Sequence, residues 1–210
     1  SRLRIIRHFS PLEGKLKAGD HSPQNRRLVA LGRLVRKKGF HLLLEAFARL
    51  EKRPNINYEL SIGGTGPEQE ALATQVVTLG LEKQVTMVGW VDDVESFLAT
   101  GDIFVLPSLE EPFGIVVIEA MAAGLPIVSS NSQGPKEILN SEIAWLCETG
   151  DLESLTGAMQ LACDNYEDSL KKSEKALHRF QQLYSKQVVI AEFIELYASL
   201  LSTQTKPSPP

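Results

Sequence analysis

The chain has 210 residues, of which 43% are hydrophobic and 23% charged, and its net charge is -4 at pH 7. This profile is typical of a globular protein with one large domain or two small ones, long enough to bury a sizeable core. The acidic balance argues against nucleic-acid binding, which usually needs a basic surface. No apolar run approaches the ~18 residues of a membrane span, and no signal peptide is visible.

The first residues of the chain and its two cysteines indicate the kind of protein and the cellular compartment to expect. The chain starts SRLRII, without a methionine, so we expect a piece of a longer protein. Cys147 and Cys163 lie in different predicted elements and form no C-x-x-C pair. They indicate neither a disulfide framework nor a zinc site, and we expect reduced thiols in a cytoplasmic protein.

Strands and helices are predicted to alternate along most of the chain. Residues 1–26, with scattered charge, glycine and proline, are expected to be a linker with one short strand at LRII. The predicted strands are 27–33, 58–64, 85–90, 102–107, 126–130 and 144–147. The predicted helices are 40–50, 67–79 (with Pro67 in its first position), 94–100, 115–123, a short one near 135–139, 152–165, 169–184 and 186–201. Residues 203–210 are expected to be a disordered tail.

This alternation predicts an α/β domain over residues 27–202, with a parallel sheet covered by helices on both faces. Ligands of such sheets bind at the carboxyl ends of the strands, near the point where the strand order reverses. The loops expected to carry the chemistry are therefore 32–39, 63–67, 89–93, 107–114 and 130–135.

Two of these loops have a composition suited to anions. Loop 32–39 reads GRLVRKKG and includes Arg33 and Lys38. Either it is a solvated basic turn or it is an anion site, in which arginine holds phosphate by paired hydrogen bonds and lysine by charge. Loop 63–66 reads GGTG, which permits close backbone approach to a ligand. It lacks the third glycine of a dinucleotide fingerprint, so a tight strand-to-helix turn is the simpler interpretation.

The most informative stretch is EPFGIVVIEAMAAG, residues 111–124, in which an apolar helix carries two glutamates eight positions apart. A buried carboxylate at Glu119 is costly unless it has a partner. A helix beginning at Pro112 would leave the first N–H groups free to attract phosphate; these belong to Phe113, Gly114 and Ile115.

The spacing of the two glutamates suits a long ligand. At a rise of ~1.5 Å per residue, Glu111 and Glu119 lie on the order of 10 Å apart along the helix, about the span of a diphosphate with a sugar at either end. Each carboxylate could accept hydrogen bonds from the hydroxyls of one sugar. The alternative is two surface glutamates on an amphipathic helix.

With these residues in this order, the chain resembles the donor-binding half of retaining glycosyltransferases of the two-domain GT-B architecture. The motif is E-x7-E, here Glu111 to Glu119 in S-x-x-E-P-F-G-I-V-V-I-E-A-M-A-A-G-L-P-I-V, preceded by GRLVRKKG, IGGTGP and VGWVDD. The resemblance covers roughly residues 27–150, with a compatible helical tail. It implies a Rossmann-like parallel sheet, one half of a GT-B fold, and retaining transfer from a nucleoside diphosphate sugar to an acceptor hydroxyl.

The resemblance also implies a role for each site residue. Arg33 and Lys38 would neutralise the donor diphosphate, and Glu111 would hydrogen-bond the transferred sugar; these three are the expected catalytic residues. Glu119 would hold the ribose hydroxyls. The other expected donor-binding residues are Gly64 near the diphosphate, Val88, Trp90 and Val91 along the base, and Phe113, Gly114 and Ile115 facing sugar and phosphate.

The family implies no metal and no other cofactor. Asp92-Asp93 lacks Asp-x-Asp spacing, and it is expected to cap the helix from Val94. The acceptor-binding half is expected to be an N-terminal domain of the same protein outside this chain, so this piece should bind donor but transfer poorly or not at all. Polysaccharide or lipopolysaccharide assembly is the implied setting, in the cytoplasm, with peripheral contact of the full-length enzyme to the inner membrane face.

The family's acceptor half also supplies a histidine close to the sugar. None of the four histidines here matches it, and all are expected to be surface or packing residues: His8, His21, His41 and His178.

Three other functions remain open. A glycoside hydrolase would use Glu111 and Glu119 as acid and base, with carboxyls ~5–9.5 Å apart. A nicotinamide-dependent oxidoreductase is suggested by the parallel sheet alone, and a regulatory nucleotide-sugar sensor would bind without turnover. The base, the sugar and the acceptor are not determined by the sequence.

Overall fold

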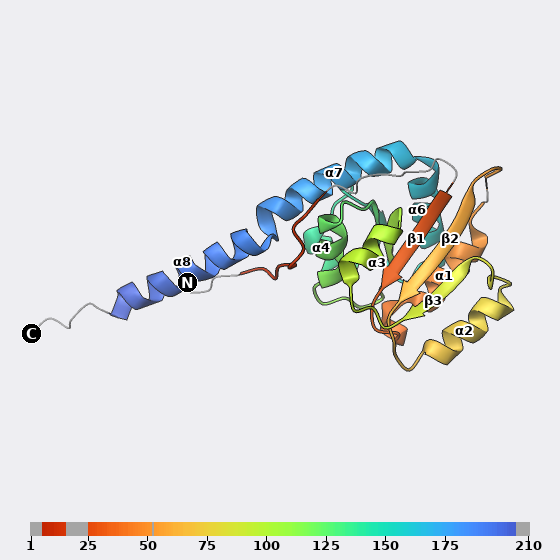
Figure 1. Ribbon diagram of the computed structural model, residues 1–210, viewed down its shortest axis with the longest axis horizontal. Coiled ribbons are helices and arrows are strands. Elements are labelled where there is room, and N and C mark those ends of the chain that lie inside the picture. The colour runs from red at the N-terminus through yellow and green to blue at the C-terminus, as the bar shows by residue number, and fades with distance from the viewer. Residues whose placement is uncertain (1–5, 16–24, 52, 205–210) are drawn as a thin grey trace, which may run out of the picture.

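The computed structural model describes residues 6–15, 25–51 and 53–204, which contain one six-stranded parallel sheet (Figure 1). Its strands are β1 (Asn25–Leu31), β2 (Asn57–Gly63), β3 (Val85–Gly89), β4 (Ile103–Leu106), β5 (Ile127–Ser130) and β6 (Trp145–Cys147). They lie in the order β3-β2-β1-β4-β5-β6, and every neighbouring pair is parallel. The predicted parallel α/β sheet is therefore confirmed.

Helices cover both faces of the sheet. They are the 3-10 helix η1 (Arg36–Lys38), α1 (Phe40–Arg49), α2 (Gln69–Thr78), α3 (Val94–Thr100), α4 (Ile115–Ala122), α5 (Pro135–Ile138), α6 (Leu152–Asp164), α7 (Tyr166–Leu183) and α8 (Lys186–Gln204). Side chains of β1 alternate between the faces: Leu28 packs in the core with α1, α2 and α6, and Val29 in the core with α3, α4, α5 and α7. The Rossmann-like arrangement follows from this alternation.

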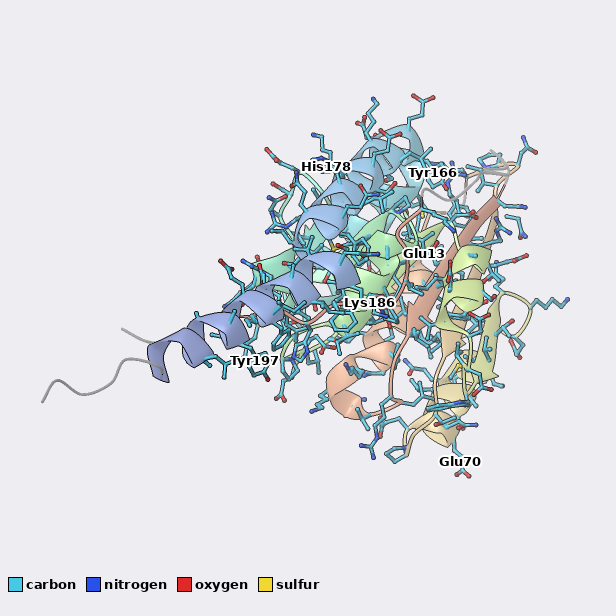
Figure 2. The ribbon with its side chains drawn as sticks, turned by 60° about the vertical axis from the view of Figure 1, so that its left-hand side comes forward. Glu13, Glu70, Tyr166, His178, Lys186 and Tyr197 are labelled. Carbon is cyan, nitrogen blue, oxygen red and sulfur yellow. The ribbon has the colours of Figure 1, made fainter. Side chains whose placement is uncertain are left out.

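The helical tail is also confirmed. Helix α8 extends away from the sheet, with Lys186 at its start and Tyr197 far along it (Figures 1 and 2). Several of its apolar side chains are exposed, including Ile194 and Leu201. Among the described residues, no helix combines the length and apolar character needed to cross a bilayer.

Some predicted boundaries were wrong by one to three residues. Strand β1 begins at Asn25 rather than residue 27, because the two polar residues at its start still pair with β2. Helix α2 begins at Gln69, and Pro67 lies in the turn before it. Helix α7 begins at Tyr166 rather than 169, and α8 continues to Gln204, past the predicted start of the tail at 203. Residues 205–210 and most of LRII lie outside the described part of the chain.

The described part of the predicted linker, residues 6–15, packs on the domain. Ser10 is fully buried, and its N–H donates to the Tyr184 carbonyl at 3.4 Å. Further along, the Lys15 N–H donates to the carbonyl of Ala122, the last residue of α4, at 3.0 Å. This segment is therefore part of the folded structure rather than a free connection.

The thiols of Cys147 and Cys163 are expected to resist modification in the native protein. Both are free and buried, and burial raises the pKa of each to about 12. The thiolate is the reactive form, so a disulfide reagent at pH 8 should react with neither thiol until urea unfolds the chain. Rapid release of the reagent's chromophore from the native protein would contradict this.

Candidate active site

The candidate site lies where the strand order reverses. Strands β2 and β3 follow on one side of β1, while β4, β5 and β6 lie on its other side. In open parallel sheets, the loops that leave neighbouring strands at such a point diverge and form a crevice at the carboxyl ends. Here these are the loops after β1 and β4, and they carry Lys38 and Glu111 respectively.

The two loops are in direct contact. The Lys37 carbonyl accepts hydrogen bonds from the N–H groups of Leu109 at 2.8 Å and Glu110 at 3.2 Å. Gly39 has a left-handed conformation (φ 71°), and a Cβ there would lie 2.0 Å from the carbonyl oxygen of Pro107. Only glycine satisfies both conditions, so Gly39 is what lets η1 and Lys38 approach the end of β4.

Lys38 and Glu111 form an ion pair through Nζ and Oε2. The Glu111 side chain is 9% exposed and that of Lys38 is 19% exposed. A carboxylate this far from water needs a cation beside it, which Lys38 supplies. Two predicted catalytic residues are thus brought together, although a direct pair between them was not predicted.

The helix predicted over 115–123 begins at the expected residue, whereas the other prediction, a helix start at Pro112, was wrong. The helix begins at Ile115, with Gly114 as its left-handed N-cap, so Pro112 and Phe113 belong to the preceding loop. Proline is favoured at the first position of a helix, but here the left-handed Gly114 separates Pro112 from the first helical residue. The structure records no hydrogen bond from the N–H of Ile115 or Val116 to another described residue. These two donors are available to a ligand.

Glu119 therefore lies only one turn inside α4, and the predicted separation of Glu111 and Glu119 along one continuous helix does not apply. The 1.5 Å helical rise applies from Ile115 to Glu119, while the four residues before Ile115 are irregular. The two carboxylates nevertheless line one cavity of about 410 Å³. Its lining residues are Leu31, Gly32, Lys38, Glu111, Pro112, Phe113, Gly114, Ile115, Val116 and Glu119.

A second cavity, of about 500 Å³, shares Leu31 and Gly32 with the first. Its other lining residues are Arg33, Gly64, Thr65, Gly66, Trp90, Val91 and Val94. The loops after β1 and β2 touch here, since a Cβ at Gly64 would lie 1.9 Å from the Gly32 carbonyl oxygen. Gly64 and Gly66 thus serve loop-to-loop packing as well as the cavity wall.

The predicted base-lining residues are only partly brought to this cavity. Trp90 is 71% exposed, and its indole Nε1–H donates to Asp92 at 2.7 Å. Val88 is 44% exposed and is not among the lining residues. Asp93 accepts from the Ser96 N–H at 2.9 Å, so its predicted role in capping α3 is confirmed.

Several lining residues were missed from the sequence. Thr65 and Gly66 stood in a loop already singled out, so the loop position itself was the available signal. Leu31, Val94 and Val116 read as ordinary apolar core positions. An apolar residue type is equally compatible with a cavity wall and with the core, so the sequence could not identify these three residues as cavity-lining.

Burial without a cation raises the pKa of Glu119. The folded state then holds the proton more tightly than the unfolded state, so this residue's contribution to the free energy of unfolding falls as pH rises through both pKa values. Glu119→Gln, which cannot ionise, is expected to be more stable than the wild type at pH 8 without ligand. The advantage should shrink as pH falls towards the ordinary value of 4.5.

Urea unfolding at pH 5 and pH 8 measures this difference. Glu70→Gln is the matched control, because it makes the same change at a side chain that is exposed on α2 (Figure 2). A Glu119→Gln variant that is less stable at pH 8, or whose advantage does not change with pH, would show that burial is not the dominant influence on Glu119.

Several known proteins are similar to this chain in sequence and in fold. It is 34% identical over 206 residues to the lipopolysaccharide core biosynthesis glycosyltransferase LpsE of Rhizobium meliloti, which covers 94% of this chain and 58% of the relative. It is 31% identical over 185 residues to the glycogen synthase of Mycobacterium tuberculosis, covering 87% of this chain and 44% of the relative. The chain spans about half the length of the curated relatives it matches.

Solved structures give the same result. Anabaena Alr3699/HepE in complex with UDP-glucose superposes with a TM-score of 0.75 at 25% identity, over 85% of this chain and 49% of that one. Sucrose-phosphate synthase from Thermosynechococcus elongatus gives 0.77 at 26% identity, over 86% and 47%. These likenesses confirm the predicted Rossmann-like half of a GT-B fold. The model of the family described as "Glycosyl transferases group 1" matches residues 15–179, and the chain belongs to that family.

Proposed function

We propose that this chain binds a nucleoside diphosphate sugar and that the protein containing it transfers the sugar, with retention, to an acceptor hydroxyl. One observation carries the proposal: Lys38, Glu111 and Glu119 meet around one cavity at the amino end of α4. A cation, two unsatisfied helix N–H groups and two carboxylates together suit a diphosphate flanked by two polyhydroxylated rings.

Each group has a chemical part in the transfer. When the sugar leaves, negative charge grows on the diphosphate, and Lys38, Arg33 and the first N–H groups of α4 would stabilise it. Glu111 would accept hydrogen bonds from the transferred sugar, and Glu119 from the ribose. The acceptor would enter on the side from which the diphosphate departs, so no separate nucleophile is needed.

The base would occupy the second cavity. Gly64, near Arg33, would face the diphosphate, while Trp90 and Val91 would border the base. Val88, which does not line this cavity, is left without a direct part in the proposal. In the same proposal, Lys38 and Arg33 neutralise the charge of the diphosphate in place of a metal ion, and no other cofactor takes part.

The comparisons support this assignment. The named complex of the Anabaena protein contains UDP-glucose, and a relative carries out lipopolysaccharide core biosynthesis. We infer similar work in polysaccharide or lipopolysaccharide assembly for the whole protein, in the cytoplasm and against the inner membrane face. We also infer a separate N-terminal acceptor-binding domain, without which this chain would transfer sugar weakly or not at all.

The rival enzymes are less well supported. A hydrolase could take its proton from Glu119, whose pKa burial raises, but it does not need Lys38 beside Glu111 or the free N–H groups at the start of α4. A dinucleotide fingerprint that begins with Gly64 and Gly66 would have its third glycine at residue 69, which is a glutamine here. A hydrolase also gives no part to Lys38 beside the start of α4.

A thermal-shift panel of UDP, GDP and ADP and their glucose and N-acetylglucosamine conjugates tests the proposed function. Binding to the folded state raises the melting temperature with the logarithm of ligand excess, so at least one diphosphate should raise it. NADH tests the oxidoreductase alternative in the same panel, and p-nitrophenyl glycosides test the hydrolase alternative by release of nitrophenol. A shift with NADH alone, release of nitrophenol, or no shift with any nucleotide would overturn the proposal.

A further inference from the structure

Besides its contacts with the loop after β1, the loop before α4 is held by two other distant parts of the chain. One contact is with Gly134, whose N–H donates to the Glu111 carbonyl at 2.8 Å and whose added Cβ would lie 2.4 Å from the Phe113 Cα. The other is with His8, whose imidazole meets the Phe113 ring edge-on, with centroids 4.8 Å apart and an interplanar angle of 63°. The position of Phe113 therefore depends on both.

The backbone around His8 is itself anchored. Ser10, two residues on, is fully buried and donates its N–H to the Tyr184 carbonyl. At the other end of this segment, the Lys15 N–H donates to the Ala122 carbonyl at the end of α4. The imidazole is thus presented to Phe113 from a segment tied to α4 and to the end of α7.

His8 contributes little to the core, because its side chain is exposed. Phe113, in contrast, lines the cavity beside Lys38 and Glu111 and directly precedes Gly114, the N-cap of α4. A contact that restrains the Phe113 ring also restrains the peptide that leads into the helix. The contact therefore bears on the direction of the N–H groups that follow, and only weakly on overall stability.

We propose that His8 is a positioning residue for the anion-binding end of α4. Its ring holds Phe113, and through it the backbone of residues 114–116, in the orientation that receives a diphosphate. The sequence prediction treated His8 as an ordinary surface or packing residue, because nothing in the sequence links it to Phe113. The diphosphate part of this inference rests on the proposed function; the restraint on the loop does not.

The test compares His8→Ala, His8→Phe and the control Arg7→Ala, which changes the exposed neighbour. Amide ¹H–¹⁵N spectra of the 210-residue chain should show shifted Gly114 and Ile115 signals in His8→Ala. His8→Phe, which keeps an aromatic edge, should return them to their wild-type positions. Titration with inorganic pyrophosphate, which needs no base, should give a Kd about three- to tenfold weaker for His8→Ala and near the wild-type value for the other two variants.

The outcomes separate this inference from the proposed function. If His8→Ala only lowers the melting temperature and leaves the two amide signals unchanged, the positioning role is overturned. A pyrophosphate Kd that does not change in His8→Ala while wild type binds also overturns it. If the wild type binds neither pyrophosphate nor any nucleotide, the proposed function fails, and the amide signals still decide whether His8 positions the loop.

Discussion

Lys38→Ala is expected to weaken binding of a nucleoside diphosphate by on the order of 100-fold. The variant removes the lysine ammonium from the cavity that also contains Glu111 and Glu119. It also leaves the Glu111 carboxylate buried without its cation, which repels a diphosphate. Calorimetric titration with the nucleoside diphosphate that gives the largest thermal shift measures the effect. Lys37→Ala is the matched control, because that neighbouring side chain is exposed and only its backbone carbonyl joins the two loops.

A variant with both residues replaced distinguishes loss of the lysine's charge interaction with the ligand from destabilisation of the folded protein. Lys38→Ala alone should also lower the free energy of unfolding, because Glu111 loses its partner. The combination of Lys38→Met with Glu111→Gln removes both charges and should recover most of that stability. It should not recover diphosphate binding. Unchanged affinity in Lys38→Ala, or restored affinity in the paired variant, would exclude Lys38 from the diphosphate site.

Asp102→Ala is expected to lower the free energy of unfolding by about 3 kcal/mol. Asp102, 2% exposed, lies just before β4 and accepts hydrogen bonds from the Arg27 side chain at 2.9 Å (Nε) and 2.8 Å (Nη2). It also accepts from the Arg27 backbone N–H at 2.9 Å. The variant would leave these donors without their acceptor at the junction of the two central strands. Urea unfolding measures the loss, which corresponds to a drop in Tm of about 6–12 °C.

The control for this prediction is Asp168→Asn. Asp168 pairs with Lys171 at 2.9 Å, but both side chains are more than half exposed, and such pairs contribute less than about 1 kcal/mol. Nucleotide affinity should be unchanged in Asp102→Ala at temperatures where it is folded, because Arg27 and Asp102 lie at the amino ends of the strands, opposite the candidate site. Equal losses in the two variants would mean that the buried pair contributes no more than an exposed one.

Much of the fold could be read from local patterns. Alternating strands and helices of suitable length leave a parallel sheet with two covered faces as the physically reasonable solution, and the strands were placed within about two residues. The ends of helices and strands were predicted less accurately than their existence. The helix predicted over 115–123 begins where α4 does, but the alternative start at Pro112 was wrong. Proline is a common first helical residue, whereas Gly114 in the left-handed conformation defers the helix to Ile115.

The sequence alone determined the α/β class, the loops that form the candidate site, and the E-x7-E spacing, since these depend on residue type and period along the chain. Only the tertiary structure decided which groups meet. The ion pair of Lys38 with Glu111 and the contact of His8 with Phe113 join residues 73 and 105 positions apart. Such pairs are set by strand order and by loop-to-loop packing, as at Gly39 and Pro107, and no local pattern encodes a contact between segments that far apart.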